Sequence, residues 1–226
     1  QRHLTIPCEM CIRDRVDEHT KLIWICSPNN PTGNSMHFED VEAILNNFNG
    51  LVVVDEAYIN FSRQRSFIPL LAEYPNLVVL QTLSKAWGLA GLRLGMAFAS
   101  EDIIHIYNKI KPPYNISEAV QELVVKALDR MEEVNEMIRE LVSQRNWLEN
   151  ELQRLPLVQH IYPSDANFLL VKVVDARAIY EYLLSREIVV RDRSKVILCE
   201  GCLRITVGTE KENRELIRVL EEFIIE

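Results

Sequence analysis

The sequence lacks the marks of a membrane protein, a disulfide scaffold and a nucleic-acid-binding protein. No apolar run approaches the length of about 18 residues that a membrane-spanning helix needs, and no signal peptide opens the chain. Five cysteines are an odd number and indicate no disulfide framework. The net charge is -8 and no long basic stripe is present, which argues against a nucleic-acid partner. We therefore expect a cytoplasmic protein without membrane or nucleic-acid partners.

The argument for a metal site rests on cysteine spacing alone. Two cysteine pairs, Cys8/Cys11 and Cys199/Cys202, have a spacing found in zinc sites. The two pairs lie almost the whole chain apart, and the second pair flanks a turn into a strand, where small buried cysteines are common. The five histidines are scattered without ligand spacing. We expect no metal.

The first half of the chain has the pattern of an α/β fold. Apolar runs predict strands at 22–26, 51–54, 77–80 and 96–99, and amphipathic patterns predict helices at 38–48 and 102–109. The run Leu51–Val54 has no polar alternation, which is typical of a parallel strand covered on both faces. Strands separated by helices predict right-handed crossovers and a mostly parallel sheet flanked by helices.

The second half predicts a smaller α+β domain joined by a long helix. Ser117 is a suitable N-cap for a helical pattern that continues to about Leu155, long enough to bridge two domains. Beyond it we expect strands at 167–173, 188–191 and 203–207, and helices at 176–186 and from 211 onward. The predicted domains are residues 1–130 and 131–226.

The start of the chain does not fit this pattern. The segment Met10-Cys-Ile-Arg-Asp-Arg15 belongs to no strand or helix that continues into the neighbouring residues, and it resembles translated sequencing-adapter strings. We hypothesise that residues 1–15 are not native to the protein. Resequencing the source DNA through this point decides the question.

Lys85 is the first candidate catalytic residue. A lysine in water is almost fully protonated at pH 7, so one that bonds to an aldehyde must be desolvated or lie near positive charge. Lys85 follows a predicted strand, and the glycine-rich segment after it can enclose its side chain. That segment contains Gly88, Gly91, Arg93 and Gly95. A Ser-Lys pair alone is more often a surface loop, and the spacing of the glycines and the arginine favours a functional lysine.

Asp55, Tyr58 and Asn30 are candidates for holding a pyridine ring. Asp55 ends a buried strand, where ligands of open α/β sheets bind, and its carboxylate can pair with a protonated ring nitrogen. Tyr58 and Asn30 can bond a ring oxygen, the latter from a turn that Pro31 and Gly33 shape. The plain alternatives are a helix cap or metal ligand for Asp55, packing for Tyr58 and an ordinary turn for Asn30.

Two further sets of side chains suit anions. The hydroxyls of Thr82 and Ser84 and the guanidinium of Arg93 match a phosphate, although no Walker-type loop is present. Arg191 and Arg204 each lie on or at the end of a predicted strand, and a half-buried arginine needs an anion. The pair can hold a phosphate dianion or a carboxylate. The alternative for these two is surface salt bridges with acidic neighbours, namely Asp192 or Glu200.

Together these segments resemble the fold-type I aminotransferases that use pyridoxal phosphate (PLP), and among them the histidinol-phosphate aminotransferases. The resemblance runs from Leu22 to the end of the chain. It is carried by Ser27-Pro-Asn-Asn-Pro-Thr-Gly33, Val54-Asp-Glu-Ala-Tyr58, the segment from Thr82 through Lys85 to Gly95, Arg191-Asp192 and Cys202-Leu-Arg-Ile-Thr-Val-Gly208.

The resemblance implies a role for each candidate. Lys85 bonds to the PLP aldehyde and then moves protons, and Asp55 pairs with the pyridine nitrogen. Asn30 and Tyr58 bond the ring 3-oxygen. Three residues hold the cofactor phosphate: Thr82, Ser84 and Arg93. Arg204 binds the glutamate carboxylate or the histidinol-phosphate phosphate, and Arg191 assists with the substrate phosphate. The implied reaction exchanges an amino group between glutamate/2-oxoglutarate and histidinol phosphate/imidazole acetol phosphate in histidine biosynthesis, in a homodimer.

The chain departs from the family at its start. Members carry further residues before the strand at Leu22, including an aromatic that stacks on the cofactor ring and a tyrosine that reaches the neighbouring subunit. We therefore expect an N-terminally truncated chain that is inactive or poorly active by itself. The alternatives are a PLP-dependent threonine-phosphate decarboxylase, a non-catalytic aminotransferase-like ligand sensor, and an inert truncated domain.

Overall fold

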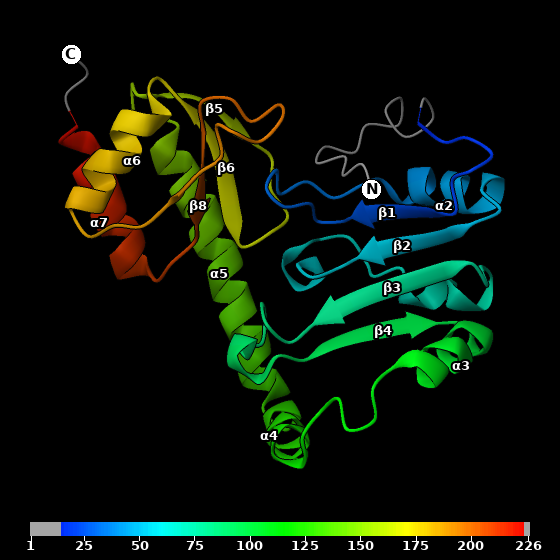
Figure 1. Ribbon diagram of the computed structural model, residues 1–226. Coiled ribbons are helices and arrows are strands. Elements are labelled where there is room, and N and C mark those ends of the chain that lie inside the picture. The colour runs from blue at the N-terminus through cyan, green and yellow to red at the C-terminus, as the bar shows by residue number, and fades with distance from the viewer. Residues whose placement is uncertain (1–14, 224–226) are drawn as a thin grey trace. The chain divides into compact units, whose positions relative to one another are not determined.

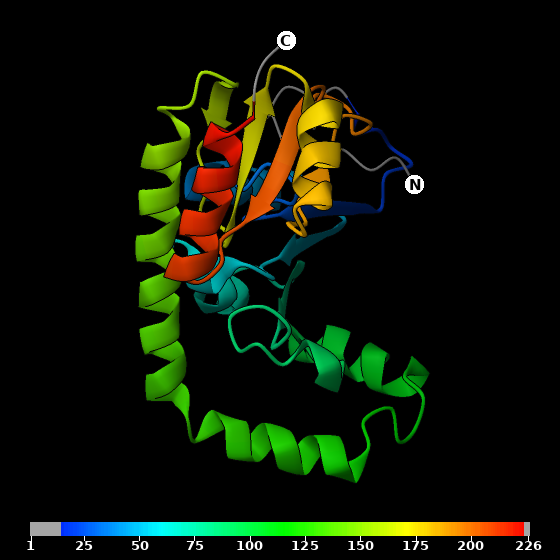
Figure 2. The same ribbon diagram turned by 90° about the vertical axis from the view of Figure 1, so that its left-hand side faces the viewer.

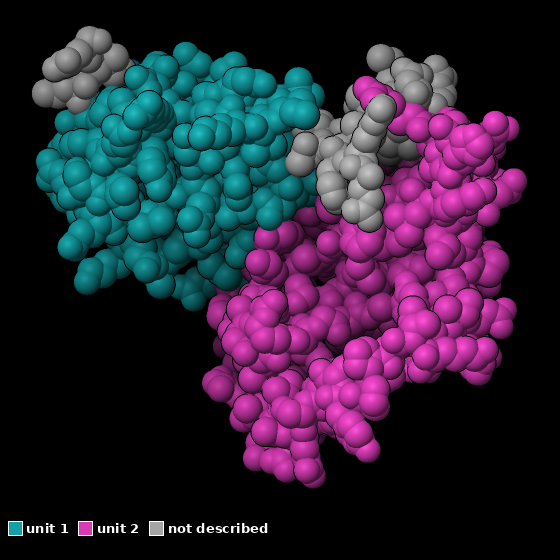
Figure 3. Space-filling model, viewed as in Figure 1, with its two compact units in different colours: residues 1–6, 29–34, 138–226 teal, residues 7–28, 35–137 magenta. Residues whose placement is uncertain are grey.

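The computed structural model describes residues 15–223, which form two compact units (Figures 1 and 3). Unit 2 contains the described residues 15–28 and 35–137. Unit 1 contains residues 29–34 and 138–223, so a short segment from the first third of the sequence groups with the last third. The hypothesis about residues 1–15 falls almost wholly outside the described residues. The predicted domain boundary at 130/131 stays a prediction.

Unit 2 is built on a four-stranded sheet of order β1-β2-β3-β4 (Figure 1). Its strands are β1 (Leu22–Cys26), β2 (Leu51–Asp55), β3 (Leu77–Thr82) and β4 (Gly95–Ala99). The first three are parallel, and β4 is antiparallel to β3. The predicted α/β class with a mostly parallel sheet is confirmed. The strand ends that carry Cys26 and Asp55 are register partners, and Asp55 pairs with Leu80 on the other side.

Helix α2 (Phe38–Asn47) covers one face of this sheet. Glu39 and Asp40 in its first turn suit the positive end of the helix. Its buried side chains, Val41 and Leu45, belong to one apolar core with inward-facing residues of the sheet. Those sheet residues are Ile23, Ile25, Val52, Val54, Leu77 and Val79. On each strand these residues are two apart, because alternate side chains of a strand point to the same face of the sheet, here the face that α2 covers.

Short 3-10 helices and longer α-helices complete unit 2. They are η1 (Ile59–Phe61), η2 (Ile68–Ala72), η3 (Ala90–Leu92), α3 (Glu101–Ile110), α4 (Glu118–Leu128) and the first residues of α5 (Met131–Leu152). Ser117 caps α4 as predicted, since its hydroxyl accepts from the Val120 N–H at 3.4 Å. No helix among residues 15–223 is long and apolar enough to cross a membrane.

The prediction of one continuous helix from 117 to about 155 is wrong. Helix α4 ends at Leu128 and α5 begins at Met131, with a turn between them (Figure 2). The Arg130 N–H bonds to the Ala127 carbonyl at 3.0 Å, three residues back, which tightens the last turn. The apolar spacing continues across this turn, and no glycine or proline marks it, so periodicity alone gives no sign of the break.

Unit 1 contains an antiparallel sheet of order β5-β6-β8-β7 with helices packed on it. Its elements are β5 (Val158–Tyr162), β6 (Phe168–Val173), α6 (Ala176–Ser185), β7 (Arg191–Asp192), β8 (Cys202–Thr206), α7 (Glu210–Glu221) and the rest of α5. Helix α7 starts with a capping box between Thr209 and Glu212. The core joins Leu148 and Leu152 of α5 to strand and helix residues such as Leu169, Ile179 and Leu220.

Two details of unit 1 differ from the sequence-based expectation. The strand expected at 188–191 is reduced to Arg191–Asp192, because Glu187 adopts φ 63° and the Ile188 N–H bonds back to Leu183 at the end of α6. Strand β5 was not predicted. Its burial is irregular, with two exposed residues in a row at Gln159 and His160 and a register shift against β6, so its sequence shows no strict alternation.

Candidate functional site

Asp55 lies at the carboxyl end of the central strand β2, half-buried between the ends of β1 and β3. The Ala57 N–H donates to its Oδ1 at 3.1 Å. Burial raises the pKa of Asp55 above its ordinary value, while the Ala57 bond and the positive charge of Lys85 act in the opposite direction. A carboxyl group in this state is stabilised by a cationic or proton-sharing partner.

Lys85 and Tyr58 lie together in the same unit. The Lys85 Nζ is 5.3 Å from the centroid of the Tyr58 ring, a cation–π distance, and Tyr58 is only 7% exposed. The charge of Lys85 also acts on the carboxyl of Asp55. The fold of unit 2 therefore gathers an acid, a phenol and an amine at the carboxyl ends of β2 and β3, where open α/β sheets bind ligands.

The expected enclosure of Lys85 is absent from the described residues. Lys85 is exposed, and a Cβ added at either Gly88 or Gly91 would meet no atom within 4 Å. The reason is local geometry: Gly88 takes φ +65° in a turn, and the segment then forms η3 and runs into β4. Gly88 thus lies in an open turn after Lys85, and neither it nor Gly91 in η3 encloses the lysine.

Two of the three residues predicted to hold a phosphate, Thr82 and Ser84, are hydrogen-bonded to each other. Thr82 Oγ1 lies 2.9 Å from Ser84 Oγ and accepts from the Ser84 N–H at 3.1 Å. It also lies 3.1 Å from the Leu94 carbonyl oxygen. Arg93 takes a left-handed conformation with φ 55°, and its exposed guanidinium bonds to the Ala90 carbonyl at 2.8 Å.

In unit 1, Asn30 and Arg204 bind each other. The Arg204 Nη1 donates to Asn30 Oδ1 at 2.7 Å, and the guanidinium carbon lies 5.1 Å from the centroid of the Phe168 ring. Arg191 on β7 is the register partner of Arg204 on β8, so the two arginines are neighbours across the ladder. An amide oxygen and an aromatic face both orient the Arg204 guanidinium, which is half-buried.

The carboxylates considered as alternative partners of the two arginines have bonds of their own. Asp192 accepts from the N–H and the hydroxyl of Ser194, at 2.8 and 2.6 Å. Glu200 accepts from the Leu198 N–H at 3.2 Å. These local turn contacts explain the acidic residues without a salt bridge to Arg191 or Arg204.

Comparison with known proteins identifies the family. A family model described as aminotransferase class I and II matches residues 11–220. The chain belongs to this family. A curated relative, histidinol-phosphate aminotransferase of Cytophaga hutchinsonii, is 56% identical over 208 residues, which is 92% of this chain and 60% of the relative. The chain therefore spans about three fifths of that relative's length.

Solved structures give the same fold. A histidinol-phosphate aminotransferase from Sinorhizobium meliloti in complex with pyridoxal-5'-phosphate matches with a TM-score of 0.82 and 27% identity, covering 91% of this chain and 57% of that one. An L-threonine-O-3-phosphate decarboxylase from Porphyromonas gingivalis matches with a TM-score of 0.81 and 25% identity, covering 92% and 66%. The fold by itself thus does not separate the two reactions.

One buried residue beside the candidate site is not indicated by the sequence patterns. Glu56, next to Asp55, is 1% exposed and accepts three hydrogen bonds. A charged residue is rarely fully buried unless it is paired. The only sequence signal is an acid that directly follows the aspartate at the end of an apolar strand, and such an acid is as easily explained by solvent exposure.

The cysteines of unit 1 have the character of core residues. Cys199 and Cys202 are fully buried and pack with Leu170. Burial raises the pKa of the Cys202 thiol to about 11. Within residues 15–223 no group of three or more histidine, cysteine or acidic side chains is arranged to hold a metal. The other half of the zinc hypothesis, Cys8 and Cys11, lies outside the described residues.

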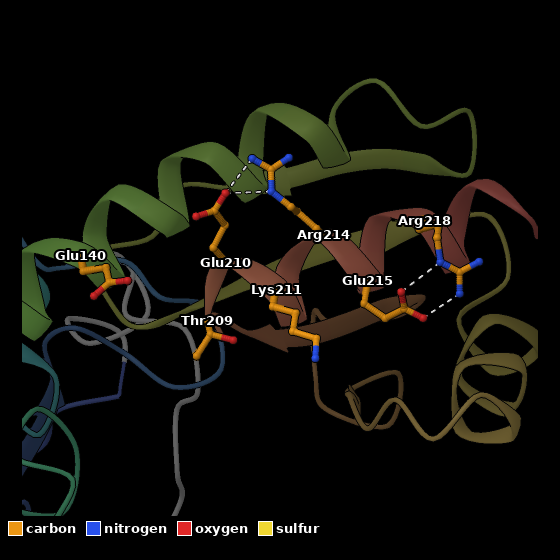
Figure 4. Close-up of a pocket in the computed structure, with 7 residues that line it drawn as sticks. All are labelled: Glu140, Thr209, Glu210, Lys211, Arg214, Glu215 and Arg218. Atoms are coloured by element: carbon orange, nitrogen blue, oxygen red, sulfur yellow. Dashed lines mark hydrogen bonds and ion pairs between the residues drawn. The ribbon is translucent and has the colours of Figure 1, made fainter.

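A hollow on the surface of unit 1 is not a good candidate site (Figure 4). It lies along α7 and is lined by Glu140, Thr209, Glu210, Lys211, Arg214, Glu215 and Arg218. Four of its charged side chains form two pairs: Arg214 with Glu210 at 2.8 Å and Arg218 with Glu215 at 2.6 Å. These exposed pairs at helical spacing are typical of a solvated helix face.

Proposed function

We propose that the whole protein is a PLP-dependent aminotransferase of histidine biosynthesis. It would exchange an amino group between glutamate/2-oxoglutarate and histidinol phosphate/imidazole acetol phosphate. The observation that carries the proposal is the group formed by Asp55, Tyr58 and Lys85. The 56% identity to a histidinol-phosphate aminotransferase supports the choice of reaction.

The residues present fit PLP. Asp55 is a half-buried carboxyl whose pKa is raised by burial, and a protonated pyridine nitrogen is a partner that would stabilise its charge. Lys85 is the amine that would bond to the aldehyde, and Tyr58 and Asn30 would bond the ring 3-oxygen. The linked hydroxyls of Thr82 and Ser84, together with Arg93, would hold the phosphate.

In this mechanism the protein's own groups bind, orient and move a proton. When bound, PLP supplies the electron sink and carries the amino group between the two half-reactions. Asp55 would keep the ring nitrogen of bound PLP charged, and the Ala57 N–H that donates to it fixes the carboxylate orientation. Lys85 Nζ would take the proton from the substrate carbon and return it at the neighbouring position. The Tyr58 ring, 5.3 Å away, orients the amine.

Arg191 and Arg204 would bind the substrates. Arg204 is oriented by Asn30 and by the Phe168 ring, and an oriented guanidinium suits bidentate binding of a carboxylate or phosphate. Arg191, exposed on the neighbouring strand, would add a second charge for the phosphate dianion. A substrate with a phosphate uses both arginines, and glutamate depends mainly on Arg204.

The proposal also covers the setting of the reaction. It includes a homodimer in the cytoplasm, and assigns residues 1–130 to a large cofactor-binding domain and 131–226 to a small domain. It includes weak activity for residues 1–226 alone, which is supported by the exposure of Lys85 in this chain.

The experiment that tests the proposal compares two products of the full-length protein. Supplied with PLP, histidinol phosphate and 2-oxoglutarate, it should form glutamate. Supplied with threonine phosphate, it should release no carbon dioxide. Carbon dioxide release without glutamate formation would favour the decarboxylase, which the fold also fits. PLP binding with neither product would favour a ligand sensor, and no binding would favour an inert domain.

A further inference from the structure

Glu56 connects the strand end that carries Asp55 to the segment that carries Lys85. Its carboxylate accepts from the Phe67 N–H at 2.6 Å, the Ser66 hydroxyl at 2.7 Å and the Gln81 side-chain amide at 2.8 Å. Its own N–H continues the ladder to the Leu80 carbonyl at 2.8 Å. All of these groups belong to unit 2.

The hydrogen bond from the Gln81 amide links Glu56 to the segment that carries the other candidate site residues. Gln81 lies on β3 immediately before Thr82, and Lys85 follows four residues later. Glu56 directly follows β2 and lies between Asp55 and Tyr58 in the sequence. This side-chain contact adds to the backbone bond between Glu56 and Leu80, and it joins the two segments whose functional groups must meet on one ligand.

The Phe67 N–H donates to the other carboxylate oxygen, Oε1, and the Ser66 hydroxyl donates to the same oxygen as Gln81, Oε2. Ser66 Oγ lies 3.4 Å from the Gln81 amide and accepts from the Ile68 N–H at 3.1 Å, so it closes a small network. Phe67 is fully buried in the sheet core, which fixes the position of its N–H. Glu56 therefore has little freedom to move, and neither do the residues attached to it.

Stability alone is a poor explanation for a carboxylate in this place. Burial raises the pKa of Glu56, and the nearby charge of Asp55 acts in the same direction, against the three donors. Replacing a buried charge together with its partners by apolar side chains of similar volume is often neutral or stabilising, so the network as a whole is not needed for stability. A hydrogen-bonded carboxylate, unlike an apolar side chain, fixes the register of its partners.

We propose that Glu56 is a positioning residue that holds the Asp55–Tyr58 segment and the Thr82–Lys85 segment in the relative arrangement that PLP requires. This inference rests on the proposed function for its ligand, but the geometry of the two segments can be measured without the ligand. Glu56 itself would touch neither cofactor nor substrate.

The test uses three variants of the full-length protein. Glu56→Met removes every acceptor at similar volume. Glu56→Gln keeps an oxygen for the Phe67 N–H and, once the Gln81 amide turns around, a bond between the two amides. Gln81→Met removes the side-chain link between Glu56 and β3, together with the longer contact to Ser66, and leaves the backbone bond to Leu80. Two quantities are measured on folded protein: the PLP dissociation constant, from the visible absorbance band, and hydrogen exchange of the amides of residues 82–85 without PLP.

The expected result separates positioning from simple stabilisation. Glu56→Met and Gln81→Met should each weaken PLP binding roughly tenfold or more, the effect of losing one buried hydrogen-bond partner, and should speed exchange at 82–85. Combining them should add little, because both remove the same link. Glu56→Gln should stay within about threefold of wild type, because it loses only the acceptor of the Ser66 hydroxyl and retains the bonds to Phe67 and Gln81.

Several results would overturn the inference. Unchanged PLP binding in Gln81→Met would do so, even if Glu56→Met fails to fold. Unchanged exchange at 82–85 in the folded variants would do so too. If the wild-type protein gives no PLP band, the proposed function fails, and the exchange measurement alone then decides the role of Glu56.

Discussion

Replacing Asp55 by Asn removes a charge and leaves almost all of the geometry. In the wild-type protein the Ala57 N–H donates to Asp55 Oδ1 at 3.1 Å. The Asn side chain keeps an oxygen for this bond, so the turn after β2 should survive. What is lost is the pairing of a carboxylate with the pyridine nitrogen of PLP. At about 4 Å and an effective dielectric of about 20, such a pair is worth about 4 kcal/mol. Partial exposure of Asp55 reduces this to about 3 kcal/mol, or roughly a hundredfold in rate.

The assay is a single-turnover half-reaction of the full-length protein with glutamate, followed through the absorbance of the cofactor. Asp129→Asn is a matched control, because Asp129 is an exposed residue in the turn after α4. Asp55→Asn should slow the half-reaction by roughly two orders of magnitude, and Asp129→Asn should leave it unchanged. A rate for Asp55→Asn within about threefold of wild type would refute the reasoning, since its electrostatic basis predicts far more.

Two further predictions concern other parts of the chain. Arg191→Ala should raise the KM for histidinol phosphate about tenfold or more and leave that for glutamate nearly unchanged, because a phosphate uses a second positive charge; equal losses for both substrates, measured by steady-state kinetics, would remove the role of Arg191. Burial raises the pKa of the Cys202 thiol from its ordinary 9.0 to about 11. As the pH rises, the unfolded chain therefore loses the thiol proton before the folded protein does, and the free energy of unfolding falls between pH 9 and 11. The free energy of unfolding should fall by up to about 1.4 kcal/mol per pH unit more steeply than in Cys202→Ser, as urea denaturation would measure; equal slopes would contradict the burial of this thiol.

Sequence patterns predicted the parts of the fold that have a simple period. Strands β2 and β3 follow from the sequence because buried parallel strands are continuous apolar runs, and the Ser117 cap because its chemistry is local. The break between α4 and α5 could not be predicted, since apolar spacing continues through it. The irregular strand β5 also gave no signal.

The candidate site was predictable in composition but not in environment. Asp55, Tyr58 and Lys85 were identified by residue type and by position at strand ends, and unit 2 brings them together. The exposure of Lys85 depends on how the glycine segment folds, which the residues alone do not specify. The role of Glu56 depends on donors that are 10, 11 and 25 residues away in the sequence. Such a long-range network has no local pattern.

The most direct test of the account asks which amine holds the cofactor. The full-length protein is incubated with PLP, reduced with borohydride, digested and analysed by mass spectrometry. The account predicts a pyridoxyl group on the peptide that contains Lys85, and none in Lys85→Ala, which should also have lost transamination. A pyridoxyl group on a different lysine, or undiminished transamination by Lys85→Ala, would contradict it.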